Sequence, residues 1–187
     1  NHRERVAVKR IALSARKIAG IETTRAEIMI EIVRARYDNP QHARAILHLL
    51  NHYAQGQSGG GKPLGAFVQE NLIAALAQRP YIFSVLAFEQ EAPVGLVNAI
   101  EGVSTFAARP LVNIHDAVVL ESHRGRGIGS SLFAEVEAIA RERGACTPPL
   151  EVLEGNHGAR ALYARLGFAP YQLDPAMGGA HFLSKPL

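Results

Sequence analysis

The sequence predicts one α/β (α+β) domain, in which a mixed, mostly antiparallel central sheet of about six to seven strands is flanked by about four helices. Three observations predict this class. Apolar segments with strand or helix periodicity alternate along the chain. Three strand-like segments follow one another without a helix between them, which favours antiparallel pairing. The length of 187 residues suits a single domain with a sizeable core.

The first elements follow from periodicity and capping signals. Apolar residues alternate over 28–33, which predicts a strand. Asn39 is then placed as an N-cap, with Pro40 in the first turn of a helix that runs to about Tyr53. Residues 55–63 carry four glycines and predict a mobile loop. A second helix begins near Leu64 and ends before Pro80.

The middle and the end of the chain supply further strands. We expect them at 81–88, 94–101 and 112–120, joined by a turn near 91–93 and by an arm at 104–110. The tail, 168–173 and 181–184, is expected to form a closing hairpin.

Charge is distributed unevenly. Residues 1–28 hold seven basic and three acidic residues, a net charge of +4 within a total of +3. We therefore expect a basic N-terminal extension over 1–28, which could form an appended helix, and a catalytic domain over 29–187. The domain lacks a basic face interleaved with aromatic residues, so the sequence predicts no nucleic-acid partner.

Cysteine content and hydropathy indicate the compartment. The single Cys146 excludes an internal disulfide framework and fits a reducing environment. No apolar run approaches the roughly 18 residues of a membrane span. The sequence thus predicts a cytoplasmic protein without a membrane partner.

Residues 113–144 are the most informative stretch, because they predict a strand, a short glycine turn and an amphipathic helix. Glycines allow backbone N–H groups to converge, and the helix start adds unpaired N–H groups and the positive end of the dipole. A pyrophosphate is the natural ligand of such a cradle. Glu135 and Glu137 towards the helix start, and Arg141 and Arg143 at its end, suit the dipole.

Two nucleotide-binding motifs compete with this interpretation and fail. A dinucleotide fingerprint that starts at Gly127 would need Gly or Ala where Leu132 stands. A phosphate-binding loop at Gly56 to Lys62 would need Ser or Thr where Pro63 stands. A plain tight turn remains an alternative for the glycines taken alone.

The remaining pattern, R-x-x-G-x-G at Arg124, Gly127 and Gly129, resembles the acyl-coenzyme A cradle of the GNAT superfamily of N-acetyltransferases. Residues 150–171, LEVLEGNHGARALYARLGFAPY, are similar to the segment that follows the cradle in that family. They supply the next strand and a helix opened by Asn156. Two matched segments in the right order are more specific than either alone. The resemblance implies the GNAT fold, acetyl-CoA as the acyl-donor substrate, and no metal.

The resemblance also implies site residues. Backbone groups of the strand pair with the pantetheine arm, amides of the turn hold the pyrophosphate, and Asn156 contacts the coenzyme arm or orders a water. Tyr163 occupies the position of the general acid to the coenzyme sulfur, although an aromatic packing role is its alternative. The coenzyme-binding set is Ala117, Val118, Val119, Arg124, Gly125, Arg126, Gly127, Ile128, Gly129, Ser130, Asn156 and Tyr163.

Two polar residues, His115 and Asp116, interrupt the apolar strand that leads to the turn, where polar groups need a partner or a function. The layout is loosely similar to the diamine acetyltransferase branch, which has a glutamate where His115 stands. An imidazole with a pKa of about 6.5 can accept a proton near neutrality. Neighbouring strand residues face opposite sides, so at most one should point at the acceptor. We expect His115 to be the base, with Asp116 or a water relay as the alternatives.

The sequence therefore predicts an N-acetyltransferase that moves the acetyl group of acetyl-CoA to a primary amine by direct attack in a ternary complex. A small-molecule amine is the expected acceptor, and a protein amine stays open. A non-catalytic acyl-CoA sensor is the rival class, which the retention of Tyr163 disfavours. His48 and His52 have metal-ligand spacing, but Leu49 stands where a zinc helix needs glutamate. Members of the family are often dimers, so a homodimer is compatible with this sequence.

Overall fold

The computed structural model describes residues 8–13, 28–146 and 148–170, together with residues 176, 178, 183 and 185. The chain divides into two compact units, residues 1–153 and residues 154–187. The first unit holds the sheet and the helices that cover it. In its described residues, the second unit holds one α-helix, at residues 157–165.

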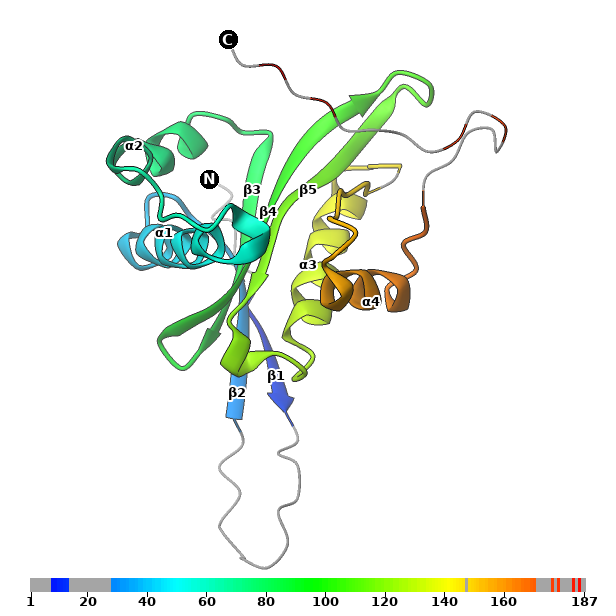
Figure 1. The fold of residues 1–187 in the computed structure, drawn as a ribbon. Coiled ribbons are helices and arrows are strands. Elements are labelled where there is room, and N and C mark those ends of the chain that lie inside the picture. The colour runs from blue at the N-terminus through cyan, green and yellow to red at the C-terminus, as the bar shows by residue number, and fades with distance from the viewer. Residues whose placement is uncertain are drawn as a thin grey trace, which may run out of the picture. The chain divides into compact units, whose positions relative to one another are not determined.

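The described sheet has five strands in sequence order, and every neighbouring pair is antiparallel (Figure 1). They are β1 (Val8–Leu13), β2 (Ile28–Arg34), β3 (Ile82–Glu89), β4 (Ala92–Ser104) and β5 (Arg109–Val119). The expected number of about six to seven strands is therefore corrected to five within the described residues. The strand expected at Leu150 is reduced to one parallel bridge with Ile114, and the expected hairpin over 168–173 and 181–184 lies almost wholly outside the described residues.

The described part of the N-terminal extension is a strand, not the expected helix. β1 pairs with β2 along its whole length, with Ile11 opposite Ile30. The backbone groups on the free edge of β2 need hydrogen-bond partners, and a paired strand satisfies several of them at once.

Three helices cover the sheet. α1 (Pro40–Gln55) and α2 (Ala66–Ala77) lie on one face, and α3 (Ile128–Glu142) lies on the other (Figure 1). The predicted start of α1 is confirmed, because the Asn39 side chain accepts hydrogen bonds from the backbone N–H groups of Gln41 and His42 at 2.8 and 3.3 Å.

The glycine-rich connection after α1 is more structured than a loose loop. It contains the short 3₁₀ helix η1 (Gln57–Gly59), and its end is tied to α1 by a hydrogen bond from the Leu64 N–H to the Asn51 side chain at 2.9 Å. A Cβ at Gly59 would lie 2.1 Å from the Tyr53 carbonyl oxygen. Glycine is therefore required where the connection folds back on α1.

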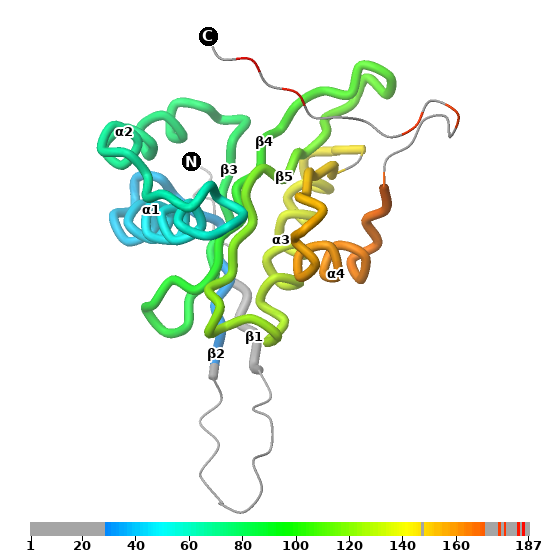
Figure 2. The backbone as a smooth tube through the Cα atoms, in the orientation of Figure 1, coloured from blue at the N-terminus to red at the C-terminus, as the bar shows by residue number. Residues whose placement is uncertain are grey.

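The sheet has two apolar faces. The α1 face buries a cluster that includes Val33, Ile46, Leu49, Leu86, Leu96 and Val118. On the opposite face, Val85 is paired with Arg34, whose side chain reaches α3. The apolar side of α3 buries Leu132, Phe133, Val136 and Ile139. The trace in Figure 2 shows β4 and β5 as a long hairpin between these two layers.

The second unit contains α4 (His157–Arg165), which was expected at this place. Its cap is Asn156, whose side chain accepts from the Ala159 N–H at 3.2 Å. Gly167, with φ of 89°, ends the helix, and the Phe168 N–H bonds the Tyr163 carbonyl oxygen at 2.9 Å. Among the described residues, no helix combines the length and the apolar character needed to cross a membrane.

Candidate functional site

The turn between β5 and α3 has the conformation of an anion cradle. After β5 comes a short 3₁₀ helix, η2 (Glu121–His123), and then Gly125 and Gly127 with φ of 74° and 80°. Gly127 is the N-cap of α3, no side chain caps this end, and the first turn holds no acidic residue. The first N–H groups of a helix have no intrahelical partner. Those of Ile128, Gly129 and Ser130 are thus available to an anion.

Both arginine side chains of the turn are bound to the protein itself. The Arg126 guanidinium donates to the Glu89 carboxylate, and the Arg124 Nε donates to the Val119 carbonyl oxygen at 3.1 Å. His123 Nε2 lies 2.9 Å from the other Glu89 oxygen. The hydrogen bond from Arg126 lowers the pKa of the Glu89 carboxyl, burial opposes this, and His123 adds to it. The turn therefore presents backbone amides, and Glu89 holds it in shape.

Gly95 on β4 sets how closely α3 approaches the sheet. A Cβ at this position would lie 2.9 Å from Leu132 Cδ1 and 3.3 Å from the Val118 carbonyl oxygen. Both distances are shorter than normal van der Waals contacts. The first turns of α3, and with them the cradle, lie directly on β4 because this residue has no side chain.

β5 is an edge strand of the described sheet. Its Ile114 N–H bonds the Pro149 carbonyl oxygen at 3.0 Å, next to the bridge to Leu150. Beyond that point, within the described residues, Ala117, Val118 and Val119 have a strand partner only on the β4 side. An extended ligand can add to such an edge as a strand would.

A β-bulge lies in the middle of β5. Asp116 pairs with Asn98 and Ile114 pairs with Ala99, so His115 has no partner on β4. The extra residue interrupts the regular pleat from which the alternation of His115 and Asp116 was expected. The His115 side chain is exposed and forms no hydrogen bond with the described residues.

Asp116 ends a chain of hydrogen bonds that crosses three strands. Tyr37 Oη lies 3.0 Å from Ser84 Oγ, Ser84 Oγ donates to Asn98 Oδ1 at 2.6 Å, and Asn98 Nδ2 donates to Asp116 Oδ2 at 3.0 Å. Ser84 and Asn98 are buried. Sequence reasoning missed both residues. The available signal was a single polar residue inside each apolar strand, as in IFSVLAF and VGLVNAI.

Two tyrosines lie on the same face of the sheet as this chain, packed against the α1-face core. Burial raises the pKa of Tyr37. The pKa of Tyr53 is raised by burial and also by the negative charge of Asp116. Tyr53 lies near the end of α1 and packs against the core cluster that includes Val118 on β5.

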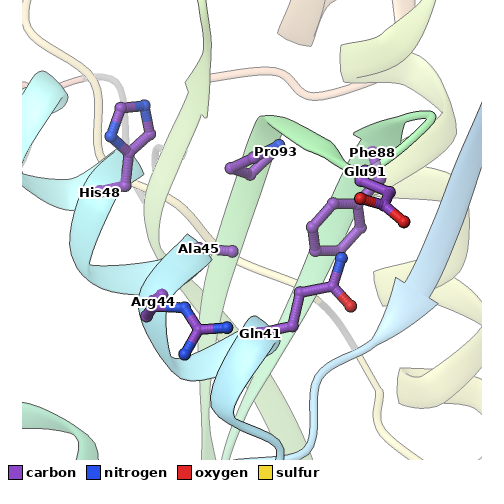
Figure 3. Close-up of a pocket in the computed structure, with 7 residues that line it drawn as sticks. All are labelled: Gln41, Arg44, Ala45, His48, Phe88, Glu91 and Pro93. Atoms are coloured by element: carbon purple, nitrogen blue, oxygen red, sulfur yellow. The ribbon is translucent and has the colours of Figure 1, made fainter.

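A separate open pocket of about 420 Å³ lies between the first half of α1 and the β3–β4 hairpin (Figure 3). Its lining includes none of the predicted site residues and consists of Gln41, Arg44, Ala45, His48, Phe88, Glu91 and Pro93. In the part of the chain that the structure describes, His48 and His52 belong to no group of three potential metal ligands.

Asn156 and Tyr163 belong to the second unit and are described within it. Asn156 caps α4, and the Tyr163 ring lies 5.9 Å from the Phe168 ring, centroid to centroid. Their roles toward the coenzyme and its sulfur remain predictions.

The described residues form an antiparallel sheet whose edge strand β5 leads into a glycine turn and then into a helix with free amides at its start. This is the arrangement that the sequence predicted for an acyltransferase. Residues 45–168, more than half of the chain, match the model of the acetyltransferase (GNAT) family. The chain belongs to this family, and its members include N-acetyltransferases that use acetyl-CoA as donor.

Relatives of known sequence and structure agree with this assignment. The chain is 43% identical over 75 residues to a streptothricin acetyltransferase of Streptomyces lavendulae, a match that covers 40% of each chain. The matched region thus spans less than half of that relative. An aminoglycoside acetyltransferase from an uncultured soil metagenomic sample, crystallised with sisomicin, has a TM-score of 0.69 and 16% identity over 84% of this chain and 97% of its own.

A ribosomal-protein-alanine N-acetyltransferase of Brucella melitensis has a TM-score of 0.59 and 19% identity, over 78% of this chain and 98% of its own. The names of these two structural neighbours refer to different kinds of acceptor, an aminoglycoside and a ribosomal protein. At such low identity the likeness concerns the fold and does not choose between acceptors.

Proposed function

We propose that this protein transfers the acetyl group of acetyl-CoA to a primary amine of a small molecule, by direct attack in a ternary complex. The observation that carries the proposal is the layout of β5. This one strand bears His115 and Asp116 at its bulge, open backbone groups at 117–119, and the glycine cradle directly after its end. Donor and acceptor groups would thus meet along one strand.

The described residues fit the donor. The pyrophosphate is negatively charged, and the start of α3 offers free amides, a favourable dipole and no acidic side chain in its first turn. The open edge at 117–119 suits the amide groups of the pantetheine arm. Arg124 and Arg126 contribute through their backbone, since their side chains bond Val119 and Glu89.

The reaction needs a neutral amine, a stabilised oxyanion and a protonated leaving thiolate. His115 is the proposed base, because its exposed imidazole forms no hydrogen bond with the described residues and could accept the ammonium proton. Tyr163 is the proposed acid that donates its hydroxyl proton to the thiolate, and Asn156 the proposed contact to the coenzyme arm. These last two roles are supported by the family motif.

The streptothricin acetyltransferase similarity supports a small-molecule acceptor over a protein amine. The match is confined to 75 residues, so the acceptor of that relative is a guide to the class of molecule and not to its identity.

Calorimetric titration with acetyl-CoA tests the donor site. We expect micromolar binding that is weakened in Gly127→Ala, because alanine at φ of 80° distorts the cradle. Gly60→Ala is the matched control, since Gly60 also has a positive φ, 97°, and open space around it. Equal affinity in all three proteins would argue against the cradle.

Thiol release in the presence of streptothricin, sisomicin, spermidine, amino acids and short peptides tests catalysis. Release with a small amine supports the proposal, whereas release with peptides alone would redirect it to a protein acceptor. Acetyl-CoA binding without any thiol release would favour the sensor alternative.

Tyr163→Phe tests the general acid. Removal of the hydroxyl should lower kcat by about 10²–10⁴-fold while acetyl-CoA affinity persists. An unchanged kcat would assign Tyr163 to packing against Phe168. His115→Ala is the corresponding test of the base, and retention of both the rate and the pH dependence of kcat/KM would exclude His115.

A further inference from the structure

The hydrogen-bond chain below the bulge has one direction. Asn98 Nδ2 donates to Asp116, so Asn98 Oδ1 must be the acceptor on its other side, and Ser84 Oγ donates to it. The single Ser84 hydrogen is then committed, and Tyr37 Oη must donate to Ser84 Oγ. All the donors point toward Asp116, whose carboxylate is the terminal acceptor.

Strand register builds this chain. Ser84, Asn98 and Asp116 are adjacent across β3, β4 and β5. Each lies two residues from a core residue of the α1 face, namely Leu86, Leu96 and Val118. Residues two apart share a face of a strand. The polar row therefore lies on the α1 face, next to the apolar core.

Asp116 lacks a cationic partner. In the described part of the chain no Lys, Arg or His forms an ion pair with it, and its only side-chain hydrogen bond is the one from Asn98. The side chain is half-buried. A partly buried carboxylate usually has a counter-charge, and a bound ligand can supply it.

We infer that Asn98, supported by Ser84 and Tyr37, is a positioning residue that holds Asp116 as the binding group for a cationic nitrogen of the acceptor. This nitrogen differs from the one that is acetylated, because the attacking amine must be neutral and Asp116 binds a charged group. The acceptor class is then a small molecule with at least two amino groups. The inference rests on the proposed function.

The surroundings of Asp116 suit such a group. Tyr53 packs against the α1-face core that includes Val118, two residues from Asp116, and the charge of Asp116 raises the pKa of Tyr53. Aromatic faces attract ammonium groups. Asp116 follows His115 directly in the chain, so the anchored nitrogen and the attacked nitrogen would lie near each other. Asp116 anchors the cation, and His115 takes the proton.

Equilibrium binding of cationic probes tests the inference without turnover. The probes are streptothricin, sisomicin and spermidine, each with several amino groups, and n-butylamine with one. They are titrated into the wild type, Asp116→Asn, Asn98→Ala and the double variant, with and without coenzyme A. Asp38→Asn is the matched control, since it removes one carboxylate charge from an exposed position.

We expect at least one multi-amine probe to bind the wild type and to bind Asp116→Asn and Asn98→Ala about 10-fold to 100-fold more weakly. Asn98→Ala should weaken binding by less than about threefold in the Asp116→Asn background, because Asn98 acts through Asp116. All variants should keep the wild-type affinity for coenzyme A, and Asp38→Asn should also keep the wild-type affinity for the probes. For any probe that is acetylated, Asn98→Ala should raise the acceptor KM and leave kcat within about threefold.

Three results would overturn the inference. The first is that no multi-amine probe binds the wild type, and the second is that such a probe binds Asp116→Asn as tightly as the wild type. The third is that Asn98→Ala weakens binding by the same factor in the wild-type and Asp116→Asn backgrounds, which would indicate a general structural role. A fall in kcat without a change in KM would make Asp116 the base instead. The acetyl-CoA titration separates these results from failure of the proposed function, because it reports the donor site alone.

Discussion

Buried polar groups are paired differently on the two faces of the sheet. On the α3 face, the buried Glu135 carboxylate is paired with the Arg34 Nε at 2.7 Å, and the same guanidinium also binds Glu142 at 2.6 and 2.7 Å. Both carboxylates thus have a cationic partner within the protein. On the α1 face, a neutral chain of hydroxyl and amide groups ends at Asp116, and no described residue neutralises that carboxylate.

This difference separates structural polar groups from candidate binding groups. Arg34 and its two glutamates connect β2 with α3, so their charges serve the fold. The Ser84 and Asn98 side chains are hydrogen-bonded to each other within the sheet. Asp116, at the end of the chain, carries a charge that no cation among the described residues neutralises. The carboxylate that has no cationic partner among the described residues is therefore the one to which we assign a ligand.

The largest expected effect comes from breaking the α3-face network. Arg34→Ala leaves the buried Glu135 charge without its partner and should reduce the free energy of unfolding by about 3 kcal/mol. Urea denaturation measures this. Arg141→Ala is the control, because the Arg141–Glu137 pair is exposed on α3 and should contribute less than about 0.5 kcal/mol. Equal losses in both variants would remove the distinction between the two kinds of pair.

A smaller loss is expected on the α1 face. Ser84→Ala leaves Asn98 Oδ1 and the Tyr37 hydroxyl without their shared partner and should cost about 1–2 kcal/mol. Its effect on amine binding should be weaker than that of Asn98→Ala, because Ser84 lies one step further from Asp116. Ser104→Ala at the β4–β5 hairpin serves as control. A stability loss as large as that of Arg34→Ala would contradict the proposed contrast.

The smallest expected effect is a change in the free energy of unfolding at acid pH. The hydrogen bond from Arg34 lowers the pKa of Glu142 from its ordinary value of 4.5, and burial opposes the change. The stabilisation is therefore complete above that ordinary value and is lost as the pH falls through the lowered pKa of the folded state. Between about pH 5 and pH 3, the wild type should lose under 1 kcal/mol more than Glu142→Gln. Parallel stability curves would show that the pair contributes nothing.

Local signals in the sequence predicted many of the elements. The Asn39 cap and Pro40 placed the start of α1, and the alternation over 28–33 placed β2. The strands β3, β4 and β5 and the turn before α3 fall where apolar runs and glycines predicted them. These features depend on neighbours in the chain, which the sequence displays directly.

Long-range pairing could not be predicted in the same way. The Arg34–Glu135 contact joins residues 101 positions apart, and the Ser84–Asn98–Asp116 row exists only because β3, β4 and β5 pair in one particular register. The bulge at His115 depends on that register too. Glu135 was expected to serve the dipole near the start of α3, but it is buried in the middle of the helix and pairs with Arg34.

Glu89 bears on the entropy of ligand binding at the proposed donor site, because it fixes the conformation of the loop before α3. One carboxylate at the end of β3 bonds both Arg126 and His123, so the loop before α3 is fixed by residues that need not touch the ligand. A loop already in its binding conformation loses less entropy when a ligand arrives. We therefore expect Glu89, a residue on another strand, to contribute to the affinity of the proposed donor site, and Glu89→Gln to make the entropy of coenzyme binding more unfavourable.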